Sequence, residues 1–293
     1  MKNEYIPRPE WMRKKKQLSK EVIHTRAKVH APGLHTVCEE ARCPNLTECY
    51  KKSVITFLIL GDVCTRNCRF CSVRHGTPET PDPEEGKKIG EYCMKQGIGY
   101  LVLTSVTRDD LPLKGAAHFC RVVQDIRVKV SDIRIELLVP DFQGSTEAMD
   151  KVIGLNIEVI GHNLETVPSL YSDIRHPAEY TQSLDILRYY RKQSPAKTKI
   201  KTGLMVGLGE TKDELIKVFQ DVYDAGTDIL TIGQYLQSGK ESVSVKKYYT
   251  KDEFKQMKSA AREIGISSVL AGPYVRSSYL ANEVYMGTLE KNV

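Results

Sequence analysis

The sequence lacks any long hydrophobic run. No apolar stretch approaches the roughly 20 residues that a membrane-spanning helix requires. The first residues also lack the apolar core of a secretion signal, since Arg8, Pro9 and Glu10 lie there. We therefore expect a cytoplasmic protein, or one in an equivalent reducing compartment, with no membrane partner.

Aromatic residues are scarce around the basic stretch near the amino terminus. The chain has a net charge of +6 at pH 7, and no aromatic residue beyond Trp11 is interleaved with these basic residues. Because nucleic-acid-binding surfaces combine basic and aromatic side chains, we expect no nucleic-acid partner. The stretch either docks an acidic protein or is a solvated arm. Its basic residues are Arg13, Lys14, Lys15, Lys16, Lys20, Arg26 and Lys28.

Cysteine is abundant, but its distribution does not suggest a disulfide scaffold. Eight cysteines occur, and six of them fall between Cys38 and Cys71. Disulfide scaffolds are typical of small secreted chains, whereas this chain has 293 residues and no recognisable secretion signal. The clustering therefore indicates metal binding or redox chemistry.

Short apolar runs alternate with amphipathic helical patterns through the body of the chain. Two of the helices begin with capping boxes, Thr211 with Glu214 and Thr250 with Glu253. The alternation predicts an α/β fold with parallel strands, either an open doubly wound sheet or a full or partial barrel. In both, the active site lies at the carboxyl ends of the strands. The predicted strands are residues 54–60, 100–106, 133–139, 157–160, 200–206, 228–232 and 268–271.

Three cysteines follow the first predicted strand, where such an active site is expected. Cys64, Cys68 and Cys71 are separated by three and two residues. Three thiolates hold three irons of a 4Fe–4S cluster and leave the fourth iron open for a chelating substrate or cofactor. Ferredoxins instead complete all four positions for electron transfer. Zinc is the alternative, but a structural zinc site usually needs four ligands in two pairs.

This triad, with Phe70 before its last cysteine, resembles the signature of the radical S-adenosylmethionine (SAM) superfamily. The resemblance implies that the open iron chelates the amino and carboxylate groups of SAM. It also implies that one electron from the cluster cleaves SAM to methionine and a 5′-deoxyadenosyl radical, which abstracts unactivated hydrogens. By the same resemblance, Phe70 belongs to the cofactor site.

A second cysteine triad precedes the first, in the polar amino-terminal stretch, where the pattern predicts neither a clear strand nor a long amphipathic helix. Cys38, Cys43 and Cys49 are separated by four and five residues. Zinc ligation and buried thiols are alternatives, but three cysteines in a polar, strand-poor stretch are poorly explained by core packing. A second iron–sulfur cluster is the simplest interpretation.

The two triads in this order resemble the lipoyl synthase family of that superfamily, and the similarity extends from about Arg8 to Tyr279. It implies a partial (β/α)6-type TIM-like barrel at residues 53–265. It further implies an N-terminal arm at residues 1–52 with the auxiliary-cluster cysteines, and a short C-terminal extension at residues 266–293 with a serine ligand. The other matching stretches are residues 35–38, 104–110, 161–167, 207–211, 233–236 and 276–279.

The resemblance also implies residue roles at the second triad. Cys38, Cys43 and Cys49 match the ligands of an auxiliary 4Fe–4S cluster, and Ser278 matches an unusual fourth, catalytic ligand. A serine alkoxide binds iron less durably than a thiolate, which suits a cluster that is taken apart as a sulfur donor. The choice of Ser278 over its neighbour Ser277 rests on the resemblance alone.

Six further residues are candidate contacts of SAM. Four of them match family stretches that line the SAM site, with turn chemistry as the alternative. The other two are basic and are candidates to meet carboxylates, with surface solvation as the alternative. The six are Thr104, Ser105, Asn163, Glu165, Arg175 and Lys201.

Three other features have simpler interpretations. The segment from Gly207 to Thr211 resembles part of a phosphate-binding loop, but it is too short for a nucleotide fingerprint and leads into a helix cap. Tight-turn geometry is sufficient to explain its glycines. Cys93 and Cys120 fall on apolar faces of predicted helices, so we expect both in the core.

The family resemblance implies a sulfurtransferase that inserts two sulfur atoms, at C6 and C8 of an octanoyl-lysine. The substrate would be carried by a lipoyl carrier domain, of the glycine cleavage H protein or 2-oxoacid dehydrogenase E2 type. A low-potential donor such as ferredoxin or flavodoxin would reduce the cluster. The alternatives are another radical SAM enzyme that inserts sulfur or transfers methylthio groups, and a non-catalytic iron–sulfur electron carrier.

Overall fold

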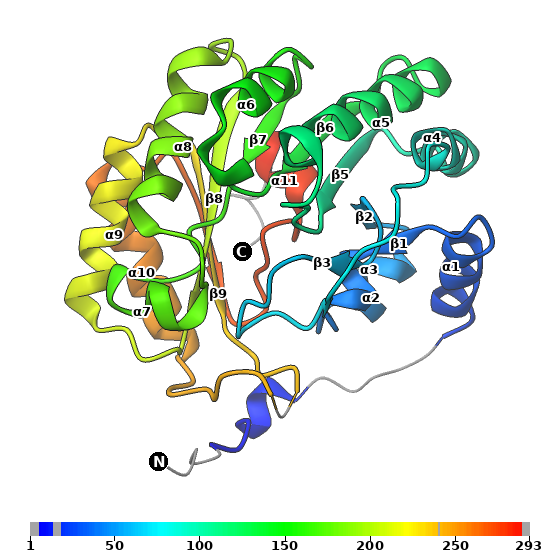
Figure 1. The fold of residues 1–293 in the computed structure, drawn as a ribbon. Coiled ribbons are helices and arrows are strands. Elements are labelled where there is room, and N and C mark those ends of the chain that lie inside the picture. The colour runs from blue at the N-terminus through cyan, green and yellow to red at the C-terminus, as the bar shows by residue number, and fades with distance from the viewer. Residues whose placement is uncertain (1–5, 14–18, 240, 289–293) are drawn as a thin grey trace. The chain divides into compact units, whose positions relative to one another are not determined.

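The computed structural model describes residues 6–13, 19–239 and 241–288, which form two compact units (Figure 1). One unit comprises Met1–Arg13, Asn67–Cys71 and Val159–Val293, and the other comprises Lys14–Arg66 and Ser72–Glu158. Lys14, Lys15 and Lys16 of the basic stretch lie outside the described residues. The three-segment division predicted from the sequence stays a prediction.

The unit built from Lys14–Arg66 and Ser72–Glu158 contains a four-stranded part of the sheet in the order β1-β2-β5-β6. Strand β1 runs antiparallel to β2, and the other neighbours are parallel. Every residue of β2 is buried, as its continuous apolar pattern predicts. The strands are β1 (His35–Thr36), β2 (Thr56–Ile59), β5 (Tyr100–Ser105) and β6 (Arg134–Leu138).

Helices α4 and α5 connect the parallel strands of this unit. In Figure 1, α4 and α5 pack side by side. Helix α4 ends at Gly97, which adopts the left-handed backbone conformation that commonly terminates a helix. The helices are α1 (Lys20–His30), α2 (Val37–Glu40), α3 (Leu46–Lys51), α4 (Glu85–Gln96), α5 (Ala116–Lys129) and α6 (Thr146–Ile153), with 3-10 turns at Pro112–Gly115 and Phe142–Gly144.

The other unit contains four parallel strands in the order β7-β8-β9-β10. Helices α8, α9 and α10 lie along one side of β8 and β9 (Figure 1). The strands are β7 (Val159–Gly161), β8 (Lys199–Val206), β9 (Ile229–Gln234) and β10 (Ser268–Gly272). The helices are α7 (Pro168–Ile174), α8 (Tyr180–Gln193), α9 (Lys212–Asp224), α10 (Lys251–Ile264) and α11 (Ala281–Tyr285), with a 3-10 turn at Glu10–Met12.

The segment after β10 packs against the strands of its own unit. Val275 and Val284 join a buried cluster with Ile229 and Leu270. The backbone of Val275 approaches β9 so closely that a Cβ at Gly233 would lie 2.1 Å from the Val275 carbonyl oxygen. Gly233 is therefore required for this segment to reach its place, which also carries the serines predicted as ligands.

Most predicted elements are confirmed. All seven predicted strands are present, and both capping boxes form with reciprocal side-chain and backbone hydrogen bonds. Each such cap stabilises its helix by about 1 kcal/mol. No helix among the described residues is both long enough and apolar enough to cross a membrane.

Two details differ from the predictions. The amino-terminal stretch was expected to lack a long helix, but α1 spans 11 residues there. Its buried side chains are Val22, Thr25 and Val29, and the Thr25 hydroxyl donates to the Tyr50 carbonyl at 3.0 Å, so part of its inner face is polar. Cys93 is buried as predicted, whereas Cys120 is partly exposed.

Candidate metal centre and cofactor site

A strained turn connects β2 to the loop of the first cysteine triad. Leu60 is buried and adopts a φ of 69°, a left-handed conformation that is unfavourable for a side chain with a Cβ. Its amide donates to the Glu85 carboxylate at 3.1 Å, and its carbonyl accepts from Arg108 at 3.2 Å. Both backbone groups are thus held by side chains from other elements, which fixes where the loop begins.

Cys64 is held by backbone contacts on both sides. It lies in the short strand β3 (Val63–Cys64), which pairs with β4 (Arg74–His75). The next residue, Thr65, donates from its amide and from its hydroxyl to the Thr107 carbonyl, each at 3.0 Å. The amide of Arg66 points at the Cys64 sulfur, with an N···S distance of 3.4 Å. Such a contact stabilises negative charge on a thiolate ligand.

The stretch from Cys68 to Cys71 belongs to the other unit and is anchored there. The Cys71 amide donates to the Cys68 carbonyl at 3.0 Å, which closes a tight turn. Phe70 packs against a buried apolar cluster. The surroundings of Phe70 therefore fix the loop, and its predicted place in the cofactor site stays a prediction. The cluster residues are Ile174, Leu208, Tyr235, Val243 and Val245.

The second triad lies on two short helices and the turn between them. Cys38 is in α2, Cys49 is in α3, and the Cys43 amide donates to the Cys38 carbonyl at 3.0 Å. Burial and, to a smaller extent, the negative charges of Cys43 and Cys49 raise the pKa of the Cys38 thiol to about 12. The three thiols are thus near enough to interact, and they are free of disulfides. A cationic cluster would offset both effects, so this donor set fits iron–sulfur ligation.

Asn163 and Glu165 directly follow β7 and lie together with Ser277. The Asn163 amide nitrogen donates to the Glu165 carboxylate at 2.9 Å and to the Ser277 hydroxyl at 2.7 Å. The Asn163 carbonyl oxygen is buried without a hydrogen-bond partner among the described residues. A buried unpaired acceptor is costly, so it indicates a place for a ligand donor.

The backbone around Glu165 is also unusual. Glu165 has a φ of 70°, and its amide and carbonyl bond to Gly203 and Met205 of β8 at 2.9 and 2.8 Å. Burial raises the pKa of the Glu165 carboxyl, and the positive charges of Arg175 and Arg276 partly offset that shift. A left-handed residue held between strand bonds at a strand end is typical of a functional site.

The two basic candidates differ in exposure. Lys201 lies in β8 beside Gly161 and is only 2% exposed, so the alternative of a solvated surface lysine is wrong. Arg175 is partly buried, donates to the Ser183 hydroxyl at 3.1 Å and lies over the Tyr171 ring. Both side chains are therefore at least partly buried, and surface solvation does not explain their positions.

Thr104 and Ser105 lie at the end of β5 in the other unit. The Thr104 hydroxyl donates to the Leu138 carbonyl at 3.0 Å, so it bridges β5 and β6. The Ser105 hydroxyl oxygen is buried and has no partner among the residues that the structure describes. Ser105 is therefore the stronger of the two candidates for ligand contact.

Similarity to known proteins identifies the family of this chain. Residues 58–222 match the Radical SAM superfamily. The lipoyl synthase of Haemophilus influenzae (strain 86-028NP) is 45% identical over 290 residues, which cover 98% of this chain and 90% of the relative. The mitochondrial lipoyl synthase of Medicago truncatula is 42% identical over 291 residues, which cover 97% and 77%. The chain belongs to the lipoyl synthase family.

Solved structures show the same fold at low identity. The FeFe-hydrogenase maturase HydG from Carboxydothermus hydrogenoformans is 17% identical, with a TM-score of 0.57 over 80% of this chain and 66% of that chain. Methylornithine synthase is 14% identical, with a TM-score of 0.54 over 73% and 70%. The likeness concerns the fold alone, and it confirms the predicted α/β class with a partial TIM-like barrel.

Family membership confirms the predicted function and enzyme class. This member of the lipoyl synthase family is a sulfurtransferase of the radical SAM superfamily. A 4Fe–4S cluster and SAM follow from the superfamily. The number of clusters and the residues that bind them are treated below as proposals.

No sequence pattern predicted a role for Arg66, Asp109 and Asp141, which the structure brings together in this lipoyl synthase family member. Arg66 lies between Cys64 and Cys68 and bonds to both carboxylates. A basic residue between two predicted metal ligands was the only local signal. The partners lie 43 and 75 residues away in the chain, so sequence spacing alone could not find them.

Glu210 determines the nature of the glycine-containing loop after β8. Its carboxylate accepts from the amides of Gly207, Leu208 and Gly209 at 2.6, 2.9 and 3.1 Å. These amides are therefore already paired with an anion of the chain itself and are unavailable to a phosphate. The tight-turn interpretation is confirmed.

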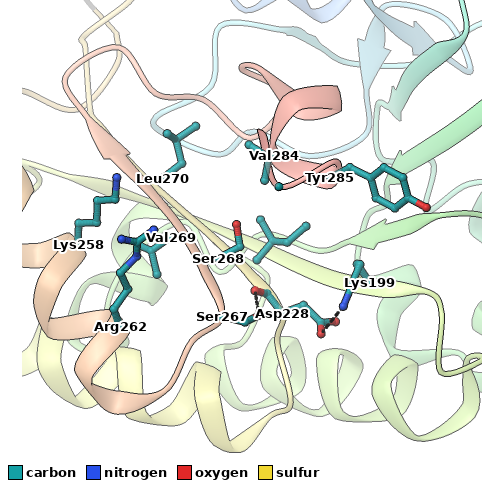
Figure 2. A pocket seen from close by; sticks show the side chains of 12 residues that line it. Lys199, Asp228, Lys258, Arg262, Ser267, Ser268, Val269, Leu270, Val284 and Tyr285 are labelled. Carbon is teal, nitrogen blue, oxygen red and sulfur yellow. Dashed lines mark hydrogen bonds and ion pairs between the residues drawn. The ribbon is translucent and has the colours of Figure 1, made fainter. Parts of the chain in front are cut away.

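A cavity of about 280 Å³ lies in the unit of β7 to β10, away from the candidate site (Figure 2). Lys199, Ile229 and Ser268 line it, and they lie at the amino ends of β8, β9 and β10. In Figure 2, Lys199 points to Asp228, with which it forms an ion pair at 3.6 Å. The candidate cofactor residues Asn163 and Glu165 instead follow the carboxyl end of a strand, as expected for this fold.

Proposed function

We propose that the two cysteine triads hold two 4Fe–4S clusters with different functions. Cys64, Cys68 and Cys71 would hold the cluster that binds SAM, because their loop leaves the end of β2 and supplies three thiolates. The second triad would hold the auxiliary cluster. Its support is the mutual interaction of three thiols, none of them in a disulfide, on α2, α3 and the turn between them.

These two groups would supply the chemistry of the reaction. When bound, the cluster of the first triad supplies the electron that cleaves SAM to a 5′-deoxyadenosyl radical. The auxiliary cluster supplies the two sulfur atoms for C6 and C8 of an octanoyl-lysine. The residues of the chain bind and orient these groups. The strained turn at Leu60 and the packing of Phe70 hold the two ends of the first ligand loop.

Ser278 is the better candidate for the fourth ligand of the auxiliary cluster. The Ser277 hydroxyl already accepts from Asn163 at 2.7 Å. Ser278 is partly exposed, and its hydroxyl takes no part in this bond. An alkoxide ligand is released more readily than a thiolate, which suits a cluster that gives up its sulfur.

Polar candidates that follow the strands would contact SAM. Asn163 and Ser105 each offer a buried oxygen with no partner among the described residues, which suits hydrogen bonds from a ligand's hydroxyl or amino groups. Glu165 would accept a hydrogen bond from a hydroxyl of the ligand. The positive charges of Arg175 and Lys201 would face the carboxylate of the ligand. Thr104 would act through its bridge between β5 and β6.

The reaction also needs a substrate carrier and a reductant. An octanoylated lipoyl carrier domain, of the H protein or E2 type, would present the substrate, and ferredoxin or flavodoxin would supply electrons. Arg26 and Lys28 of α1 offer positive charge for an acidic carrier domain, although Arg26 bonds to Glu39 at 2.5 Å. The exposed Cys71 thiol suits a reducing compartment such as the cytoplasm.

The experiment that tests this function supplies an octanoyl-lysyl peptide, SAM and a low-potential reductant to the anaerobically purified protein. Mass spectrometry should show a product that has gained two sulfur atoms, together with 5′-deoxyadenosine. Unchanged or merely desaturated peptide, with both clusters intact at the end, would contradict sulfur insertion. Formation of 5′-deoxyadenosine without any sulfur product would leave radical initiation in place and remove the auxiliary-cluster role.

A further inference from the structure

Arg66 bridges two carboxylates that follow neighbouring strands. Its Nε and one Nη donate to Asp109 at 2.7 and 2.9 Å. Its two Nη atoms also donate to Asp141 at 2.5 and 2.8 Å. Asp109 follows β5, and Asp141 follows β6. Both pairs are bidentate, so the guanidinium plane is fixed on two sides.

The Arg66–Asp141 pair is buried, unlike the pair that Arg69 makes nearby in the chain. The side chains of Arg66 and Asp141 are 9% and 1% exposed. Arg69, three residues on, pairs with Asp173 through side chains that are 47% and 60% exposed. Exposed pairs contribute little, whereas removing one partner of a buried pair leaves an uncompensated charge. Arg66 is therefore built into the structure in a way that Arg69 is not.

The backbone of Asp109 also holds the ligand loop. The Asp109 amide donates to the Thr65 hydroxyl at 3.1 Å, and that hydroxyl donates to the Thr107 carbonyl at 3.0 Å. The Arg66 amide in turn points at the Cys64 sulfur at 3.4 Å. The side chain of Arg66 thus fixes the position of its own amide, and the amide contacts the thiol of Cys64.

We propose that Arg66 is a positioning residue for Cys64: by bridging Asp109 and Asp141 it holds its own amide on the Cys64 sulfur and fixes the orientation of this ligand. The inference rests on the proposed ligation of the first cluster by Cys64. Residues that orient metal ligands affect metal retention and activity by about 10- to 100-fold when they are changed. A lysine cannot replace Arg66, because an ammonium group cannot make two bidentate pairs at once.

The test compares Arg66→Gln, Arg66→Lys and Asp141→Asn with the matched control Arg69→Gln, all as anaerobically purified holoprotein. Two readouts are independent of turnover: the rate of iron release to a chelator, and the EPR spectrum of the reduced protein with and without SAM. Each of the first three variants should lose iron from the first cluster about tenfold faster and show a broadened spectrum with a weaker response to SAM. Arg69→Gln should match the wild type.

The set of variants separates positioning from a simple charge effect. Arg66→Gln removes a positive charge and Asp141→Asn removes a negative one, so an effect of charge alone would move the two variants in opposite directions. Positioning predicts that both move in the same direction. Wild-type iron release and EPR spectra in Arg66→Gln would overturn the proposal. If Arg66→Gln does not fold by circular dichroism, Arg66→Lys and Asp141→Asn decide.

A further control separates this inference from the ligand assignment. Cys64→Ala should abolish the EPR signal that responds to SAM. If that signal persisted in Cys64→Ala, the assignment of the first cluster would fail, whatever the Arg66 variants showed. If it disappeared while the Arg66 variants behaved like the wild type, only the role of Arg66 would fail.

Discussion

The side-chain amide of Asn163 donates to the Ser277 hydroxyl across 2.7 Å, although 114 residues separate the two in the chain. This bond distinguishes two adjacent serines that the sequence could not tell apart. Ser277 is joined to the residues that follow β7, whereas Ser278 remains available for a ligand. The distinction leads to the first prediction.

Ser278→Ala should stop formation of the two-sulfur product while 5′-deoxyadenosine is still formed. Ser277→Ala should keep sulfur insertion and lose about 1 kcal/mol of stability, because Asn163 loses a hydrogen-bond acceptor. Product mass spectrometry and thermal unfolding of both variants check this prediction. The reverse pattern, with sulfur insertion lost only in Ser277→Ala, would assign the ligand to Ser277.

Gly203 should tolerate no side chain. A Cβ at this position would lie 2.8 Å from the Asn163 carbonyl oxygen and 2.9 Å from the hydroxyl oxygens of both Ser277 and Thr231. Gly203→Ala is therefore expected to lower the free energy of unfolding by about 1–3 kcal/mol and to weaken SAM binding. Urea unfolding and equilibrium binding of SAM measure the two effects.

Gly99→Ala is the matched control for this substitution. A Cβ at Gly99 would meet no atom within 4 Å, and its backbone is not left-handed. The change should alter the free energy of unfolding by less than about 1 kcal/mol in either direction. Equal destabilisation by the two substitutions would contradict the prediction that steric contacts at Gly203 exclude a side chain.

Substitutions should distinguish the functions of the two triads. Cys68→Ala removes a proposed ligand of the SAM-binding cluster, so it should abolish formation of 5′-deoxyadenosine. Cys43→Ala removes a proposed ligand of the auxiliary cluster, so it should leave SAM cleavage and stop sulfur insertion. Chromatography of 5′-deoxyadenosine and mass spectrometry of the peptide check both. Equal loss of SAM cleavage in two folded variants would contradict separate roles.

Thiol labelling tests the ligand set without turnover. Burial raises the pKa of Cys93 to about 12, so at pH 8 its thiol remains protonated and should not react with iodoacetamide in the folded protein. With both clusters bound, the six triad thiols should also be protected, which leaves the partly exposed Cys120 as the labelled residue.

After chelation of the iron, Cys71 should be labelled first, because it is exposed. Peptide mass spectrometry reads each site; equal labelling of Cys43 before and after chelation would remove it from the ligand set.

Local patterns in the sequence were sufficient for the strands and for the capped helices. The boxes at Thr211 and Thr250 depend on residues three positions apart, and such signals are read directly. Helix α1 was missed because one of its three buried side chains, Thr25, is polar and pairs with Tyr50 rather than adding to an apolar stripe.

The candidate site was predictable only in part, for a related reason. Cysteine spacing revealed both triads, since all their members are close in sequence. The bridge of Arg66 to Asp109 and Asp141, the bond of Asn163 to Ser277 and the burial of Lys201 all depend on contacts between distant segments. Such contacts are products of the fold, and no local pattern encodes them.

Iron and sulfide quantitation on the anaerobically purified protein tests the central claim most directly. If each triad holds its own 4Fe–4S cluster, the wild type should contain about eight irons and eight sulfides per chain, and Cys43→Ala about four of each. About four irons in a fully reconstituted wild type, or about eight retained in Cys43→Ala, would contradict the account.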